Sequence, residues 1–168
     1  MTNTPVLLQN KPLDMGKTSD KFISDIQAKL DSVNQHAAAF LVLKPQFIKM
    51  TDDNIDLIGD RVEILNGKYK GDEKKAKLDP AYIKLGQQAD LVETNTGAMF
   101  NTMENHLKAI TNACADAMFL LTKFETFVNE KDKTTKMPWN KKSIGSSKTY
   151  IAETRAAIKA YKPPEFRL

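Results

Sequence analysis

Apolar side chains recur along most of the chain at alternating intervals of three and four residues, the spacing that places them on one face of an α-helix. No stretch shows the alternation of apolar and polar residues that is typical of a half-buried strand. The chain is therefore predicted to be all-α. The first apolar row follows an N-cap signal at Thr18 or Ser19 and consists of Ile23, Ile26, Leu30, Val33, Ala37 and Phe40.

A second row lies beyond Pro45, which either kinks one helix or serves as the first residue of the next. Thr51 offers an alternative N-cap for that next helix, and Asn66-Gly67 indicates its end, with Tyr69 as an extension. The row consists of Ile48, Thr51, Ile55, Ile58, Val62, Leu65 and Tyr69.

The clearest helix start in the chain is Asp79-Pro80, an N-cap followed by proline at the first helical position. The row that begins at Tyr82 and ends at Phe127 keeps its spacing across the helix-weakening stretch Thr94 to Gly97. A single glycine costs a helix only about 1 kcal/mol, so one long helix is predicted from Pro80 to about residue 130. After Gly97 the apolar stripe becomes wider, which requires cover from more than one side.

The C-terminal part is expected to hold a basic loop over residues 129–146 and a last helix over about 147–161, ended by Pro163-Pro164. Residues 1–17 contain Pro5, Pro12 and Gly16 and are expected to form an extended arm. The remaining residues, 18–168, are predicted to form a single helical-bundle domain.

Two arrangements fit this order of elements, both of them antiparallel helical bundles with coiled-coil-like packing. Residues 19–69 and 80–130 have equal lengths, so antiparallel pairing brings together residues whose numbers add to about 149. Thr51 then faces Gly97, and both helices weaken at the same level. The first arrangement is a long kinked helical hairpin with a short C-terminal helix, and the second is a folded-over bundle of about five helices.

Composition places the chain among soluble proteins. It has 168 residues, 41% hydrophobic and 27% charged, and a single cysteine, Cys114, which excludes an intrachain disulfide. No apolar run approaches the roughly 18 residues of a membrane span, and no signal-peptide pattern precedes Val6. A cytoplasmic location is expected, although export without a signal peptide would leave no trace in this pattern.

The net charge of +4 is concentrated in two segments, Lys68 to Lys77 with +3 and Lys131 to Lys142 with +4. These segments suggest a non-specific binder of nucleic acid or of an anionic membrane surface. Lysine outnumbers arginine 22 to 3, and arginine is the residue preferred for specific base contacts, so sequence-specific recognition is disfavoured. The candidate contacts are Lys68, Lys70, Lys74, Lys75, Lys77, Lys131, Lys133, Lys136, Lys141 and Lys142.

No catalytic motif or cofactor fingerprint is present. The Glu-x-x-His pairs of bundle metal sites are absent, and the two histidines, His36 and His106, are expected to miss each other by about 10 Å in the predicted pairing. Cys114 lies among alanines and is expected to be buried and unreactive. No cofactor, metal or small-molecule substrate is therefore predicted, and an enzyme with a site that no motif reveals is the least favoured of the alternatives.

The favoured hypothesis is a non-enzymatic interaction module, such as an adaptor, an assembly subunit or an effector-type protein. It would bind another protein, or a second copy of itself as a homodimer, through apolar helix faces, because contiguous exposed apolar patches mark such sites. Tryptophan and methionine are enriched in protein interfaces. The candidate contact residues are Met99, Phe100, Met103, Met118, Phe119 and Trp139.

Overall fold

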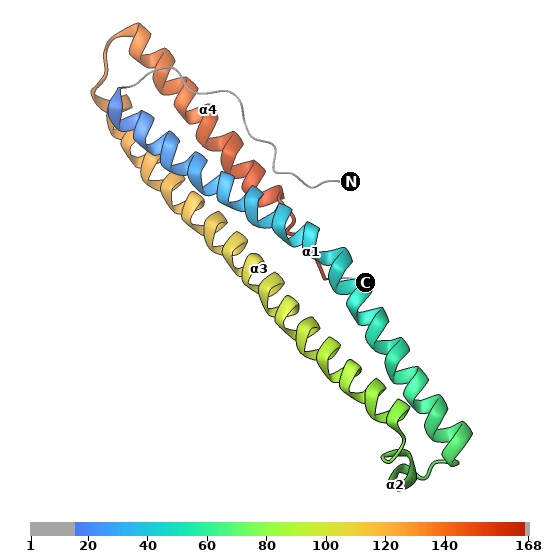
Figure 1. Cartoon of the computed structure of the whole chain (residues 1–168). Helices are drawn as coiled ribbons and strands as arrows, with labels where there is room; N and C mark the ends of the chain where they lie inside the picture. Colours follow the sequence, from blue (N-terminus) through green and yellow to red (C-terminus); the bar gives the residue numbers. More distant parts are fainter. Residues whose placement is uncertain (1–15, 167–168) are drawn as a thin grey trace. The chain divides into compact units, whose positions relative to one another are not determined.

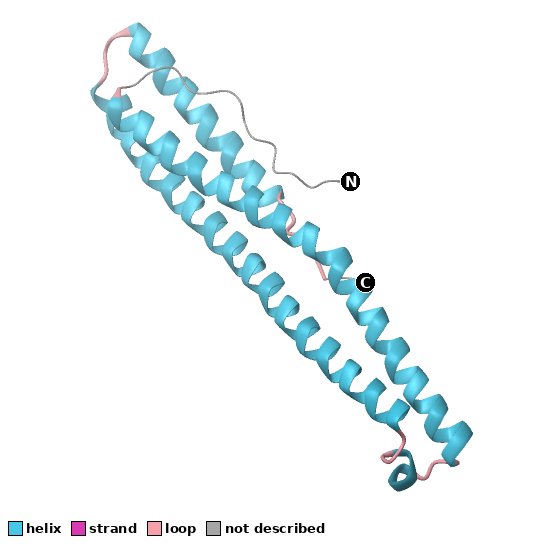
Figure 2. Ribbon diagram, in the orientation of Figure 1, coloured by secondary structure: helices cyan, strands magenta, loops and turns pink. Residues whose placement is uncertain are grey.

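The computed structural model describes residues 16–166, apart from the side chain of Trp139. Within this range it contains four helices and no strand (Figures 1 and 2). The helices are α1 (Lys17–Tyr69), α2 (Glu73–Ala76), α3 (Pro80–Thr134) and α4 (Pro138–Ala160). The all-α helical bundle predicted from the sequence is confirmed. Most of the predicted arm lies outside the described residues.

The helices form two compact units. Among the described residues, the three-helix unit comprises residues 16–39 and His106–Glu165, and so holds the first part of α1, the second part of α3 and all of α4. The two-helix unit comprises Phe40–Asn105 and Phe166, with the remaining parts of α1 and α3 and the short α2 between them.

The first five residues of the predicted first apolar row, from Ile23 to Ala37, lie in the core of the three-helix unit, and the sixth, Phe40, belongs to the two-helix unit. All six residues of that row are buried. Within the unit, Ile23, Ile26 and Leu30 pack with apolar residues of α3 and α4, and the rings of Phe22 and Phe124 stack with centroids 5.3 Å apart. Helix α1 is therefore covered here from two sides, by α3 and by α4.

Helix α4 begins at Pro138, well before the predicted start near residue 147. Its proline occupies the first turn, where the missing N–H does no harm, after Met137 in an extended conformation. The predicted basic loop is therefore wrong for most of its length. A three-four spacing of buried or half-buried residues runs through the glycine- and serine-rich start of the helix, at Ile144, Ser147, Ile151, Thr154 and Ile158.

Neither long helix breaks where its sequence weakens, so the arrangement with five shorter helices is wrong. Helix α1 continues through Pro45 and Thr51, and α3 continues through Gly97. The Thr51 hydroxyl donates to the Phe47 carbonyl at 2.9 Å, four residues earlier. Such back-bonding lets a threonine stay inside a helix, and it shows that Thr51 is not a cap.

The second apolar row of α1 was predicted to pack against the antiparallel helix, but most of it does not form the core of the two-helix unit. Ile55, Ile58 and Val62 are 62%, 48% and 47% exposed. The half-buried residues of this part of α1 instead extend the spacing of the first row without a phase change, and several are polar. They include Lys44, Phe47, Thr51, Asn54, Arg61 and Leu65.

The start of α3 is the one that the sequence predicted. Asp79 accepts hydrogen bonds from the backbone N–H groups of Ala81 at 2.8 Å and Tyr82 at 3.4 Å, as an N-cap residue does. The same side chain accepts from the Lys68 ammonium at 2.6 Å and the Tyr69 hydroxyl at 2.7 Å. The end of α1 and the start of α3 are thereby tied together by one carboxylate.

Candidate protein-interaction groove

An exposed apolar strip runs along α1 in the two-helix unit. Leu41, Ile48, Ile55 and Val62 recur every seven residues, so they lie on one line of the helix. Three of them are 47% exposed or more, and Ile58 beside them is 48% exposed. We call Ile48, Ile55, Ile58 and Val62 the α1 strip.

Carboxylates flank the α1 strip on its outer side. Asp52, Asp56 and Glu63 lie about 60–100° around the helix from Ile55, at 100° per residue. None of these carboxylates has an ion-pair partner among the described residues. The uncovered side of α1 is therefore both apolar and negatively charged.

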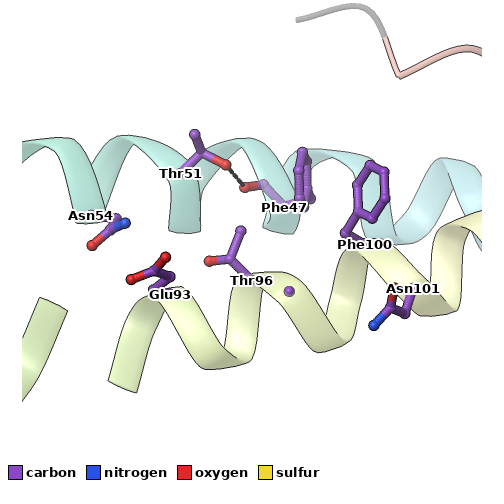
Figure 3. Close-up of a pocket in the computed structure, with 8 residues that line it drawn as sticks. Phe47, Thr51, Asn54, Glu93, Thr96, Phe100 and Asn101 are labelled. Carbon is purple, nitrogen blue, oxygen red and sulfur yellow. Dashed lines mark hydrogen bonds between the residues drawn. The ribbon is translucent and has the colours of Figure 1, made fainter. Parts of the chain in front are cut away.

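A groove opens between α1 and α3 beside this strip. The groove is shallow and open to solvent, with a volume of about 370 Å³. Thr51 lines it and lies three residues after Ile48 and four before Ile55, so the α1 strip forms one edge of the groove. The groove is lined by Phe47, Thr51, Asn54, Glu93, Thr96, Gly97, Phe100 and Asn101 (Figure 3).

Unsatisfied hydrogen-bond acceptors lie at one end of the groove. Asn54 and Glu93 approach there from opposite helices (Figure 3). The Asn54 Oδ1 atom is buried and accepts no hydrogen bond, and Glu93 has no ion-pair partner among the described residues. The hydroxyls of Thr51 and Thr96 donate to their own helices. The Asn54 Oδ1 atom therefore receives no hydrogen bond from either hydroxyl.

The other end of the groove is aromatic. Phe47 and Phe100 lie there, with ring centroids 6.1 Å apart, and Phe166 from the C-terminal segment stacks on Phe100 at 4.7 Å. Phe166 also contacts Phe40 edge-on, with centroids 5.2 Å apart. The chain thus already places one of its own apolar side chains against this end of the groove.

The six predicted protein-contact residues do not form one surface. Phe100 lines the groove and is 41% exposed, Met99 is half-buried, and Met103 is fully buried. A residue with no exposed surface cannot contact a partner, so Met103 is corrected to a core position. In the three-helix unit, Met118 packs against the core, and Phe119 is exposed with the Lys123 ammonium 4.4 Å from its ring centroid. Trp139 lies outside the described side chains.

The first group of predicted anion-contact lysines lies around α2 in the two-helix unit. Three of its five members form ion pairs within the chain: Lys68 with Asp79, Lys75 with Asp72 and Lys77 with Glu73, at 2.6, 3.3 and 3.6 Å. Lys70 and Lys74 are exposed. The local carboxylates thus neutralise much of the charge that the sequence concentrates here.

The second group belongs to the three-helix unit and is mostly helical, not part of a loop. Lys131 and Lys133 lie on α3, Lys141 and Lys142 on α4, and Lys136 between the two helices. Asp132 pairs with Lys141 and with Lys148, and these two ammonium groups lower the pKa of the Asp132 carboxyl to about 2.

The two histidines meet, against the expected mismatch. Their Nδ1 atoms are 2.9 Å apart within the three-helix unit. In this unit, the numbers of facing residues on α1 and α3 add to about 145, as those of Lys29 and Asp116 do, and not to the predicted 149. This difference in register brings the two histidines together.

The described residues contain no group of three or more histidine, cysteine or acidic side chains placed to hold a metal ion. Burial raises the pKa of the Cys114 thiol.

None of the helices in the described part of the chain has an apolar stretch long enough to cross a bilayer. No family model matches the chain, and neither a curated protein nor a solved structure shows detectable similarity to it.

Proposed function

We propose that the protein is a non-enzymatic interaction module whose two-helix unit binds a basic amphipathic helix of a partner protein. The supporting observation is the α1 strip. In the three-helix unit apolar residues of α1 are covered by α3 and α4, whereas three of the four strip residues, Ile55, Ile58 and Val62, are exposed. A helix laid along α1 and α3 would cover the strip, as in helix-in-groove recognition.

The charge of the groove specifies a basic partner. The outer edge carries Asp52, Asp56 and Glu63, and the α3 edge carries Asp90 and Glu93, all without ion-pair partners among the described residues. Lysine or arginine side chains flanking the apolar face of a bound helix would meet carboxylates on both sides. Such complementarity raises association rates and selects against acidic partners.

A second copy of the chain is a less suitable occupant. Two α1 strips packed symmetrically would bring the same unpaired carboxylates toward each other, and juxtaposed like charges disfavour association. Binding of nucleic acid or an anionic membrane through the lysines is also less well supported, because several of them are paired with acids. The single cysteine suits a reducing compartment, so we place the interaction in the cytoplasm.

The test uses a synthetic helical peptide three heptads long, with leucine at the a and d positions, lysine at e and g, and alanine and glutamine elsewhere. Titrated into the full-length protein, it should bind with one-to-one stoichiometry, more weakly as salt rises. A peptide with glutamate in place of lysine should not bind. Light scattering of the free protein should report a monomer.

Two matched variants test whether peptide binding depends on the α1 strip or on any exposed apolar side chain. Ile55→Gln with Val62→Gln should weaken binding at least tenfold. Leu91→Gln is the control, because Leu91 is 61% exposed but lies about half a turn around α3 from Phe100. The proposal is wrong if the basic peptide does not bind, if both variants bind equally, or if the strip variant only dissociates a homodimer.

A further inference from the structure

We infer that Phe166 is an intramolecular competitor of the partner helix, because its ring occupies a site that an apolar side chain of the bound helix would otherwise fill. This inference rests on the proposed function and adds a regulation of the same groove. We call the three rings that Phe166 contacts, those of Phe40, Phe47 and Phe100, the aromatic site. Phe47 and Phe100 also line the groove and lie at one end of it (Figure 3).

The first reason is the specific way in which Phe166 is held in the two-helix unit. Its ring stacks on Phe100, with centroids 4.7 Å apart and ring planes inclined by 26°. It meets Phe40 and Phe47 edge-on, at centroid distances of 5.2 and 6.1 Å. Stacked and edge-to-face contacts are the arrangements that aromatic rings prefer. The aromatic site therefore binds a planar apolar side chain that another segment of chain presents to it.

The second reason is that Phe166 is carried by a segment outside the helices. Residues 161–166 form no helix, and Lys162, Pro163 and Glu165 among them are exposed. A ring presented by such a segment can leave its site without unfolding a helix. Two successive prolines restrict the backbone of the segment, so little conformational freedom is lost when the ring binds. The segment thus resembles a tethered ligand, which competes at a high effective concentration.

The third reason is overlap with the place of the partner helix. Ile48 of the α1 strip follows Phe47 directly in α1, and Phe100 is 41% exposed even with Phe166 stacked on it. A helix that covers the strip from Ile48 to Val62 therefore reaches the level of the aromatic site. Its apolar side chain at that level and the Phe166 ring cannot fill the same volume. The apparent affinity for the partner is then reduced in proportion to the fraction of molecules in which the site is free.

The first experiment compares binding of the leucine- and lysine-bearing peptide by variants of the full-length protein. Phe166→Ala should bind the peptide about fivefold more tightly than the wild type, because the aromatic site is then free in every molecule. Phe119→Ala is the matched control, since it removes the same ring from a 60% exposed position of α3 in the three-helix unit. The control should leave the affinity unchanged. An unchanged or lower affinity of Phe166→Ala overturns the inference.

The second experiment follows the Phe166 ring without replacing it. The protein is labelled with 4-fluorophenylalanine, and the fluorine NMR signal that disappears in Phe166→Leu belongs to this residue. Saturating peptide should move that signal toward the position of a solvent-exposed ring, because the bound helix displaces Phe166 from the aromatic site. A signal that stays in place at saturation overturns the inference.

The outcomes separate this inference from the proposed function. If the wild type and Phe166→Ala bind the peptide equally, and the Ile55 and Val62 variant does not bind it, the competitor role is wrong and the proposed function stands. If neither the wild type nor Phe166→Ala binds the peptide, both are wrong.

Discussion

The Nδ1 atoms of His36 and His106 lie 2.9 Å apart, and the two ring planes are inclined by 46°. A neutral imidazole has one donor nitrogen and one acceptor nitrogen. The contact therefore requires one ring to carry its proton on Nδ1 and the other on Nε2. The pair joins α1 to α3 at a half-buried position in the three-helix unit.

Replacing either histidine with alanine should lower the free energy of unfolding, and the two losses should not add. The coupling energy between neutral hydrogen-bonded groups is expected to be about 1 kcal/mol. Urea unfolding of the wild type, both single variants and the double variant at pH 8 measures it. Strictly additive losses would show that the two rings pack beside each other without a stabilising bond.

The Gly97→Ala variant should be more stable than the wild type by up to about 1 kcal/mol, because alanine restricts the unfolded chain and favours the helix. A Cβ atom at this position meets no other atom within 4 Å. Thermal unfolding followed by circular dichroism gives the change. A loss of stability would mean that Gly97 is needed for a conformation other than a plain helix.

Gly86→Ala provides the contrasting case. A Cβ atom there would lie 3.2 Å from Cζ of Arg61, whose guanidinium lies over the Tyr82 ring at 4.4 Å from its centroid. The arginine must shift to accept the methyl group, which disturbs that cation–π contact. The gain in stability should therefore be smaller than for Gly97→Ala, or reversed.

Acid should destabilise the fold in part through Asp79. Hydrogen bonds from Lys68, from Tyr69 and from the Ala81 backbone hold the pKa of this carboxyl well below its usual range. An aspartate in an unfolded chain has a pKa of about 3.9. The stabilising effect is therefore fully present above this pH and disappears as the pH falls toward the folded-state pKa.

Asp79→Asn isolates this effect, because asparagine can still cap the helix. The variant should be less stable than the wild type at pH 6, and the difference should shrink by pH 2.5. Midpoints of thermal unfolding at the two pH values measure both quantities. Asp132→Asn is the companion variant, since the pKa of Asp132 is lowered in the same direction by Lys141 and Lys148. A constant difference between wild type and Asp79→Asn would contradict the assignment.

The sequence identified the helices well but not what covers them. The row from Ile23 to Phe40 is buried as predicted, and its first three residues pack with apolar residues of both α3 and α4. Ile55 and Val62 have the same spacing but stay exposed. Periodicity reports which side chains favour burial, and it does not report whether a neighbouring helix is available.

The groove was missed for a related physical reason. In the two-helix unit α1 faces α3 through polar residues, and Arg61 packs over the Tyr82 ring beside the small Gly86. An apolar pattern cannot reveal such an interface. Of the residues singled out from the sequence for partner contact, Phe100 lines the groove. Asn54 could have been found only by extending the three-four spacing of the first row of α1 through Pro45, and Glu93, on α3, is not reached by that spacing.

Pro45 removes one backbone hydrogen bond from the interior of α1. It has no N–H to donate to the Leu41 carbonyl four residues earlier, although the helix continues through it. Local opening of a helix begins where such bonds are missing. Amide hydrogen exchange should therefore divide this geometrically continuous helix into a slowly exchanging stretch before Pro45 and a faster one after it, and a bound helix would erase the difference.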